Sequence, residues 1–278
     1  MIHASLREIA EDKLLKCESQ FYESQVPLST DEARKRTRPA VERLLIFYHT
    51  ISTLIPQIKE KSLPSKALEV GTGYGALSLS LAEIFHHFEW TGVEHPKRLY
   101  VKDPRYWELF EQSDCHLELC DIKTETLPFD DNFFSLITFS EVLEHLPIEK
   151  ILFVIGEMHR VLHPGGWIVA SSPNLVSLLN RIMFLRGKSI FAPPVPLDDA
   201  GGTYGHIHLY TADEFVALCR QFGLEVRQIQ YMSRFLKYKQ DTRFWKNLAY
   251  KICWIIDLLF RPLTKKLADT WYVVLQKS

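Results

Sequence analysis

The chain has 278 residues, of which 46% are hydrophobic and 24% are charged. These fractions are typical of a folded globular protein and exclude a disordered chain, a collagen-like repeat and a coiled coil. The formal net charge of −1 argues against a protein that coats nucleic acid. The five cysteines form no CxxC pair, and the N-terminus lacks the apolar run of a signal peptide. No uncharged apolar stretch is long enough to span a bilayer. Together these features predict a cytoplasmic protein.

The chain begins with a region that the pattern predicts to be helical. Residues 1–62 are expected to form a helical lid, in which Leu44–Ile58 is apolar on a helical period and Pro56 and Pro64 mark the end of the helix. Lys66–Val70 is then a short apolar strand, and it begins a domain that we expect to cover residues 63–278.

Strands and helices alternate through that domain, which is typical of a mostly parallel sheet with helices on both faces. His163–Gly166 ends a helix with a proline and two glycines. The segment 173–210 interrupts this alternation of strands and helices. We expect it to cover one end of the sheet, because long loops inside compact domains are usually functional. The predicted strands are 66–70, 89–94, 115–122, 135–140, 167–171, 224–231 and 271–276, and the predicted helices are 76–85, 104–112, 149–162 and 211–221.

A glycine-rich turn, with Gly71, Gly73 and Gly75, joins the first strand to the helix that follows it. Glycine lets the backbone turn sharply and lets a ligand approach closely, and the helix N-terminus offers N–H groups. A plain strand-to-helix turn would use the same residues. Glu94, at the end of the next strand, adds a carboxylate that can accept hydrogen bonds from two ribose hydroxyls. Glu69 would repel phosphate but attract an ammonium group, so the pattern favours a nucleoside ligand without phosphates.

These motifs resemble the class I S-adenosylmethionine (SAM)-dependent methyltransferases, in particular the type 11, ubiquinone-biosynthesis-like group. The resemblance implies a Rossmann-like, doubly wound, seven-stranded and mostly parallel sheet with helices on both faces. It also implies SAM as the cofactor. The matching segments, in chain order, are Glu69–Gly75, Glu94, Asp121-Ile122, Ser140-Glu141 and His163–Gly166.

The same resemblance assigns residues to the methionine end of SAM. Gly71 and Gly73 are expected to lie under the methionine part, with Glu69 near its amino group. Ser140 and Glu141 are expected to line the site at the end of the fourth strand.

At the nucleoside end, the resemblance implies that Glu94 holds the ribose. Asp121 would face the adenine amino group, and Ile122 would pack on the adenine ring. Asp121 could also serve only as a cap at the end of its strand.

A cluster of acidic and histidine residues follows the fourth strand. If the chain makes a helical turn there, Glu141, Glu144 and His145 converge at one end of the sheet, where the later His206 can join them. His206 and His208 alternate, so only one of them should point into the site. The set would suit a divalent metal with mixed oxygen and nitrogen ligands and resembles that of the metal-dependent small-RNA 2′-O-methyltransferases, but helix capping by Glu144 and local packing of His145 are the favoured interpretation.

Methyl transfer from SAM needs no covalent nucleophile, because the sulfonium already activates the methyl group. The protein has to align the acceptor atom and exclude water. A base helps only where the acceptor is a hydroxyl or another weak acid. The candidate bases are His145, His206, His208 and Tyr210, each of which could instead be a surface or packing residue.

The segment 234–266 combines nine Lys/Arg and two Asp with many aromatic residues. We consider three interpretations: a helical cover on the core, a peripheral membrane-surface helix that takes up an amphiphilic substrate, and a nucleic-acid contact. The long apolar run argues against nucleic acid. Arg181 and Met183–Leu185 are expected to join this segment in walling a large apolar acceptor pocket.

The sequence therefore predicts a SAM-dependent methyltransferase that acts on a small or lipid-like acceptor, with oxygen as the favoured acceptor atom. Two alternatives within the resemblance are a non-catalytic SAM-binding regulator and a metal-dependent RNA 2′-O-methyltransferase-like enzyme. A nicotinamide oxidoreductase is disfavoured by the GxGxG spacing and by Glu69. The sequence leaves the acceptor and the oligomeric state open.

Overall fold

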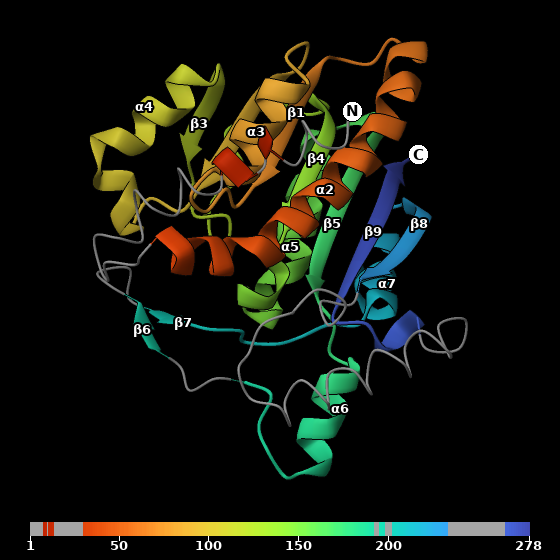
Figure 1. Cartoon of the computed structure of the whole chain (residues 1–278). Coiled ribbons are helices and arrows are strands. Elements are labelled where there is room, and N and C mark those ends of the chain that lie inside the picture. Colours follow the sequence, from red (N-terminus) through yellow and green to blue (C-terminus); the bar gives the residue numbers. More distant parts are fainter. Residues whose placement is uncertain (1–7, 10, 14–29, 192–194, 198–201, 233–264) are drawn as a thin grey trace.

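The computed structural model describes residues 8–9, 11–13, 30–191, 195–197, 202–232 and 265–278 (Figure 1). The basic, apolar segment 234–266 lies outside the described residues except for its last two, so its three interpretations stay predictions. Most of residues 1–29 also lie outside them.

Seven strands form one twisted sheet in the order β3-β2-β1-β4-β5-β9-β8. The first five are parallel, while β9 runs antiparallel to both of its neighbours. This arrangement confirms the predicted seven-stranded, mostly parallel α/β sheet. The strands span Lys66–Val70 (β1), Glu89–Glu94 (β2), Cys115–Leu119 (β3), Phe134–Ser140 (β4), Leu162–Pro173 (β5), Leu224–Met232 (β8) and Thr270–Lys277 (β9).

Helices cover both faces of the sheet, as expected from strands that are buried on both sides. One apolar core lies between the sheet and the helices α2, α3 and α4, and a second lies between the opposite face and the helices α5 and α7 (Figure 1). These helices span Thr30–Glu60 (α2), Ala76–Ile84 (α3), Pro104–Gln112 (α4), Ile148–Val161 (α5) and Ala212–Arg220 (α7).

Helix α2 ends at Glu60, between Pro56 and Pro64, the two prolines that were expected to mark its end. Pro56 lies inside the helix, which runs on to Glu60. A proline in a helix interior removes one backbone hydrogen bond. Ile55 and Ile58 on either side of it are buried in the core, so apolar packing compensates for the lost bond. Whether residues 1–62 act as a lid stays a prediction, but α2 itself is built into the core of the sheet.

Strand β5 begins earlier than the sequence suggested. His163–Gly166 was expected to be only a turn after the helix, yet these residues belong to the strand. The pairing register with β4 shifts between Phe134 and Leu136. The Pro-Gly-Gly run lies at this shift, as extra residues of β5 in an irregular stretch of the pairing. Gly165 has a φ of +79°, which a glycine adopts without strain.

The segment between β5 and α7 leaves the sheet at the carboxyl end of β5. It contains the short helix α6 (Leu178–Leu185) and a two-stranded ribbon, β6 (Val195–Leu197) with β7 (Gly202–Tyr204). Figure 1 shows α6 extending away from the sheet. The chain then returns to α7, whose start is fixed by Thr211 and Glu214 in a reciprocal capping box.

Candidate functional site

The glycine loop lies at the position in the sheet where the strand order reverses. Strands β1 and β4 are neighbours there, and ligands of open α/β sheets bind outside the carboxyl ends of the strands at such a point. Gly71 has a φ of +80°, and a Cβ on it would lie 2.5 Å from Val142 Cγ2. The loops that follow β1 and β4 therefore touch, and Gly71 makes that approach possible.

Glu94 ends β2 and faces this loop. Its Oε2 accepts a hydrogen bond from the Gly73 N–H at 2.6 Å, and its Oε1 accepts one from the His95 N–H at 2.7 Å. The side chain is buried, which raises the pKa of its carboxyl. Arg98 Nε lies 3.8 Å from Oε1 and partly offsets that burial. The carboxylate is thus held beside the glycine loop, where the sequence predicted it.

Glu69 lies beneath the loop. Its Oε2 accepts hydrogen bonds from the N–H and the hydroxyl of Ser78 in the first turn of α3. Burial raises the pKa of the Glu69 carboxyl to about 8, and the two Ser78 bonds counteract only part of that shift. In this structure the carboxyl group therefore anchors the loop to α3. Its contact with the amino group of SAM stays a prediction.

Asp121 follows β3 and faces the residue after Glu94. Its Oδ2 lies 3.5 Å from His95 Nε2, and its Oδ1 accepts a hydrogen bond from the Lys123 N–H at 3.1 Å. Ile122 packs partly buried against the second apolar core. Glu94 and Asp121 thus lie at the carboxyl ends of neighbouring strands, because β2 and β3 pair in parallel.

Ser140 ends β4, the neighbour of β1 in the sheet, and Glu141 follows it. Ser140 Oγ lies 3.2 Å from Ser171 Oγ, which in turn lies 3.3 Å from Glu141 Oε1. Arg43 of α2 pairs with Glu141 Oε2 at 2.5 Å. Glu141 has a φ of +57°, an uncommon conformation for a residue with a side chain. Such strain persists only where the surroundings hold the residue in place, and the ion pair with Arg43 is one of the contacts that do so.

Glu144 is the most deeply buried acidic residue of the predicted cluster. It is 1% exposed, and its Oε2 accepts a hydrogen bond from Ser172 Oγ at 3.0 Å. Its Oε1 has no hydrogen-bond partner among the residues that the structure describes. Burial, with a smaller contribution from the charge of Glu141, raises the pKa of Glu144 well above its usual range.

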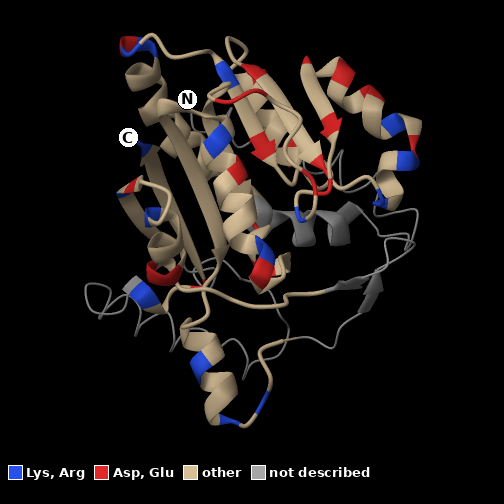
Figure 2. Cartoon of the chain, turned by 180° about the vertical axis from the view of Figure 1, so that it is seen from behind, with Lys and Arg blue, Asp and Glu red and all other residues tan. Residues whose placement is uncertain are grey.

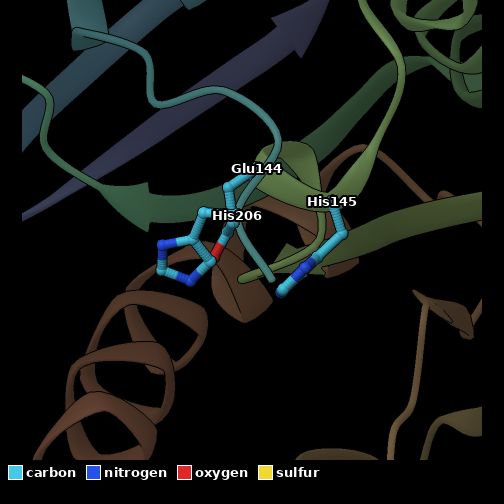
Figure 3. Close-up of side chains that lie close together, drawn as sticks. All are labelled: Glu144, His145 and His206. Atoms are coloured by element: carbon cyan, nitrogen blue, oxygen red, sulfur yellow. The ribbon is translucent and has the colours of Figure 1, made fainter. Parts of the chain in front are cut away.

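Two histidines lie beside that carboxylate (Figure 3). One donor atom each from Glu144, His145 and His206 lie within 4.8 Å of one another, and His206 Nε2 is 4.0 Å from Glu144 Oε1. His206 reaches this position because the N–H groups of Ile207 and His208 donate to the Glu144 carbonyl, at 2.7 and 3.4 Å. Glu144, His145 and His206 therefore come together as expected, whereas Glu141 pairs with Arg43 and is not part of this group.

The structure separates the remaining candidate bases from this cluster. The His208 ring packs against the Tyr210 ring at a centroid distance of 4.5 Å. Tyr210 is 6% exposed and belongs to the second apolar core. Its hydroxyl has no hydrogen-bond partner within the described part of the chain. Of the alternating pair, His206 is the one that faces the acidic residues, and a catalytic role for Tyr210 stays a prediction.

Sequence reasoning missed the residues that hold the site residues in place. Arg43 lies on α2, Ser78 on α3, and Ser171 and Ser172 on β5. Each has an ordinary residue type, and all except Ser78, which is nine residues from Glu69, lie far along the chain from their partners. A polar residue in the middle of an apolar run was the one available signal, at Ser171 and Ser172 within the β5 strand.

A family model of a methyltransferase domain matches residues 36–229 of this chain. The chain therefore belongs to the SAM-dependent methyltransferase family, and its sheet is the Rossmann-like fold of the class I enzymes. Among solved structures, it resembles a SAM-dependent methyltransferase from Archaeoglobus fulgidus with a TM-score of 0.53 and 17% identity, covering 84% of this chain and 94% of that one. At that identity the likeness shows the fold.

Two curated relatives carry more specific names. A demethylmenaquinone methyltransferase from Staphylococcus epidermidis is 32% identical over 133 residues, which cover 45% of this chain and 51% of the relative. A ubiquinone biosynthesis O-methyltransferase from Aromatoleum aromaticum is 25% identical over 169 residues, covering 60% of this chain and 67% of the relative. The chain spans about half the length of the first of these relatives.

Proposed function

We propose that this chain transfers the methyl group of SAM to an oxygen atom of a small, lipid-like acceptor. The observation that carries the proposal is that two groups of residues lie together at the carboxyl ends of the parallel strands. The glycine loop and Glu94 lie on one side, and on the other Val142, which follows Ser140 and Glu141 at the end of β4, meets Gly71 of that loop.

In this proposal SAM lies across the carboxyl ends of β1, β2 and β3. Gly71 and Gly73 support its methionine part, because a side chain there would fill the space. Glu94 accepts hydrogen bonds from the ribose hydroxyls in place of its present bond to the Gly73 N–H. Asp121 accepts from the adenine amino group, and Ile122 packs on the ring.

Ser140 and Glu141 complete the methionine end. Their position at the carboxyl end of β4, next to Val142, which meets Gly71, supports a contact with the donor. Glu69, beneath the loop, lies near the amino group of the methionine part.

The reaction needs alignment and one proton acceptor. The methyl carbon leaves sulfur as its bond to the acceptor oxygen forms, and the electron pair of the broken bond stays on sulfur, giving S-adenosylhomocysteine. The hydroxyl proton of the acceptor passes to a base. We place that role on His145 or His206, since a base must be neutral and burial lowers the pKa of His145.

The acceptor class rests on the relatives and on the exposed surface of α6, the helix that follows β5. The names of two relatives refer to quinones, namely demethylmenaquinone and ubiquinone. Helix α6, which follows β5, exposes Leu179, Phe184 and Leu185. In Figure 2 this helix and the turn after it show only positive charge, which fits an amphiphilic acceptor. Membrane contact through 234–266 stays a prediction. In the part of the chain that the structure describes, no helix has the length and apolarity needed to cross a bilayer.

Ligand binding tests the proposal first. S-adenosylhomocysteine should raise the melting temperature of the protein and give a calorimetric binding signal, whereas NAD should do neither. Release of S-adenosylhomocysteine from SAM should then be measured with phenols, quinone precursors, polyprenyl lipids and short RNAs. Turnover with the lipid-like phenols supports the proposal. Turnover with RNA alone would replace it with the RNA methyltransferase alternative, and binding without turnover would favour a regulator.

A further inference from the structure

We propose that Glu144, His145 and His206 form a binding site for one divalent transition-metal ion beside the crevice. The inference deepens the proposed function, on which its catalytic meaning rests, although ion binding can be measured without it. It differs from the interpretation favoured by the sequence analysis, in which Glu144 caps a helix and His145 packs locally.

The first observation is the unpartnered oxygen of Glu144. The side chain is 1% exposed, and a carboxylate oxygen buried without a hydrogen bond costs free energy. Ser172 holds Oε2, so the orientation of the carboxylate is fixed and Oε1 is directed toward the histidines (Figure 3). A cation bound at Oε1 would offset the cost of burying that oxygen.

The second observation is the orientation of His145. Its Nδ1 lies 3.0 Å from the Gly205 carbonyl oxygen, to which a protonated Nδ1 donates. This bond selects the tautomer in which Nε2 carries the lone pair. Histidines that bind metals usually donate their other ring N–H to a carbonyl or a carboxylate in this way. The contact also ties the 205–208 segment to the acidic cluster, which places His206 over Glu144.

The spacing of the donor atoms fits one ion. Ligands at 2.0–2.2 Å from a metal lie about 3–4.4 Å from one another, and the donor atoms here lie within 4.8 Å. His206, whose side chain is 42% exposed, can rotate to close the remaining distance.

The ligand types select the class of ion. Two imidazoles and one carboxylate favour ions such as Mn²⁺, Co²⁺ and Zn²⁺, whereas Mg²⁺ and Ca²⁺ prefer oxygen ligands. Three protein ligands leave coordination positions open, and one of them could take the acceptor oxygen. A metal-bound hydroxyl has a lowered pKa. With the ion bound, His145 and His206 would be ligands in place of the base proposed above, and the proton of the acceptor would pass to solvent water.

Ion binding should be measured on the full chain after treatment with a chelator. We expect one Mn²⁺ per chain by electron paramagnetic resonance, displaced by Zn²⁺ and not by equimolar Mg²⁺. Glu144→Gln and His206→Ala should each lower the Mn²⁺ affinity at least about tenfold, since changing even the groups around a metal's ligands costs 10–100-fold. His208→Ala is the matched control and should bind Mn²⁺ like the wild type, because its ring packs on Tyr210.

Calorimetry with S-adenosylhomocysteine on the same preparations separates this inference from the proposed function. If the wild type binds S-adenosylhomocysteine but takes up neither Mn²⁺ nor Zn²⁺ at millimolar concentration, the metal site is overturned and the proposed function stands. Wild-type Mn²⁺ affinity in His206→Ala would also overturn it. If the wild type instead binds Mn²⁺ but does not bind S-adenosylhomocysteine, the proposed function is overturned.

Discussion

At the scale of single residues, the burial of acidic side chains distinguishes this molecule. Glu69, Glu94 and Glu144 are each at most 5% exposed, and burial raises the pKa of each carboxyl. Buried carboxyl groups are costly unless they are paired or neutral, and perturbed carboxyl groups gather at functional sites. Glu69 and Glu94 hold the glycine loop through hydrogen bonds from Ser78 and Gly73, whereas Glu144 keeps an oxygen without a partner among the described residues.

Replacing Glu94 tests the ribose contact. Glu94→Gln should weaken S-adenosylhomocysteine binding about 10–100-fold, because a hydrogen bond to a charged group contributes about 1.5–3 kcal/mol. Isothermal titration calorimetry measures the change. Glu89→Gln, at the exposed start of the same strand, is the control and should leave the affinity unchanged. Equal affinities of the two variants would contradict the assignment of Glu94 to the ribose.

Replacing Glu69 tests the effect of its raised pKa on stability. The unfolded chain loses this proton near pH 4.3, while the folded chain retains it up to about pH 8. Wild-type stability should therefore fall as pH rises between those values, because only the unfolded state ionises readily. Glu69→Gln removes the titrating group. The stability of Glu69→Gln relative to the wild type should therefore increase from about pH 5 to pH 8 in urea unfolding. A constant difference across that range would contradict the buried neutral carboxyl.

At the scale of elements, the loops that follow β1 and β4 restrict each other. Gly71 meets Val142, whereas a Cβ on Gly73 would have no atom within 4 Å, although both glycines have positive φ. The two positions therefore separate backbone strain from steric contact. Gly71 serves a close approach between elements, and Gly73 serves the turn and the space for a ligand.

Alanine substitutions at the two glycines should differ in their effect on stability. Gly73→Ala should cost about 1–2 kcal/mol, the strain of a side chain at positive φ. Gly71→Ala should cost more, because the rigid Val142 side chain cannot rotate away from a Cβ at 2.5 Å. Thermal unfolding of the ligand-free proteins measures both. Adding Val142→Ala to Gly71→Ala should recover part of the loss, and no recovery would mean that the contact does not limit the loop.

At the scale of the whole molecule, α2 joins the N-terminal region to the C-terminal strand. Phe47 of α2 is fully buried, and its ring packs edge-on against Tyr272 of β9 at 5.9 Å. The same helix carries Arg43, which pairs with Glu141 at the site. The helix is therefore part of the core, and it also holds Glu141 of the candidate site through Arg43.

Truncating Phe47 tests that coupling. Phe47→Ala should lower the free energy of unfolding by about 3–5 kcal/mol, as expected for a large buried ring. Unfolding should remain a single transition by circular dichroism and by fluorescence, because α2 shares its core with β1 and β9. His49→Ala, at an exposed position on the same helix, is the control and should change stability little. A separate early transition in Phe47→Ala would show that α2 folds apart from the sheet.

Much of the fold was predictable because its signals are local. Lys66–Val70, Glu89–Glu94 and Pro104–Gln112 have the predicted bounds, since each is a short apolar or amphipathic run ended by glycine, proline or a polar residue. Where tertiary packing outweighed the local signal, the prediction was wrong. His163–Gly166 was expected to be a turn, yet β5 includes these residues because β4 pairs with β5 on both sides of them, at Leu162 and at Trp167.

Local sequence determined the strand–glycine loop–helix unit, the acidic residue at the end of β2 and the ExxEH segment after β4. Each depends on spacing within a few residues, which the chain carries before it folds. Tertiary structure alone decided that Arg43 holds Glu141, that Ser172 orients Glu144 and that His206, not His208, faces Glu144. Those contacts join residues that are distant in the chain, and their partners are set by the order of strands in the sheet and by backbone hydrogen bonds between loops.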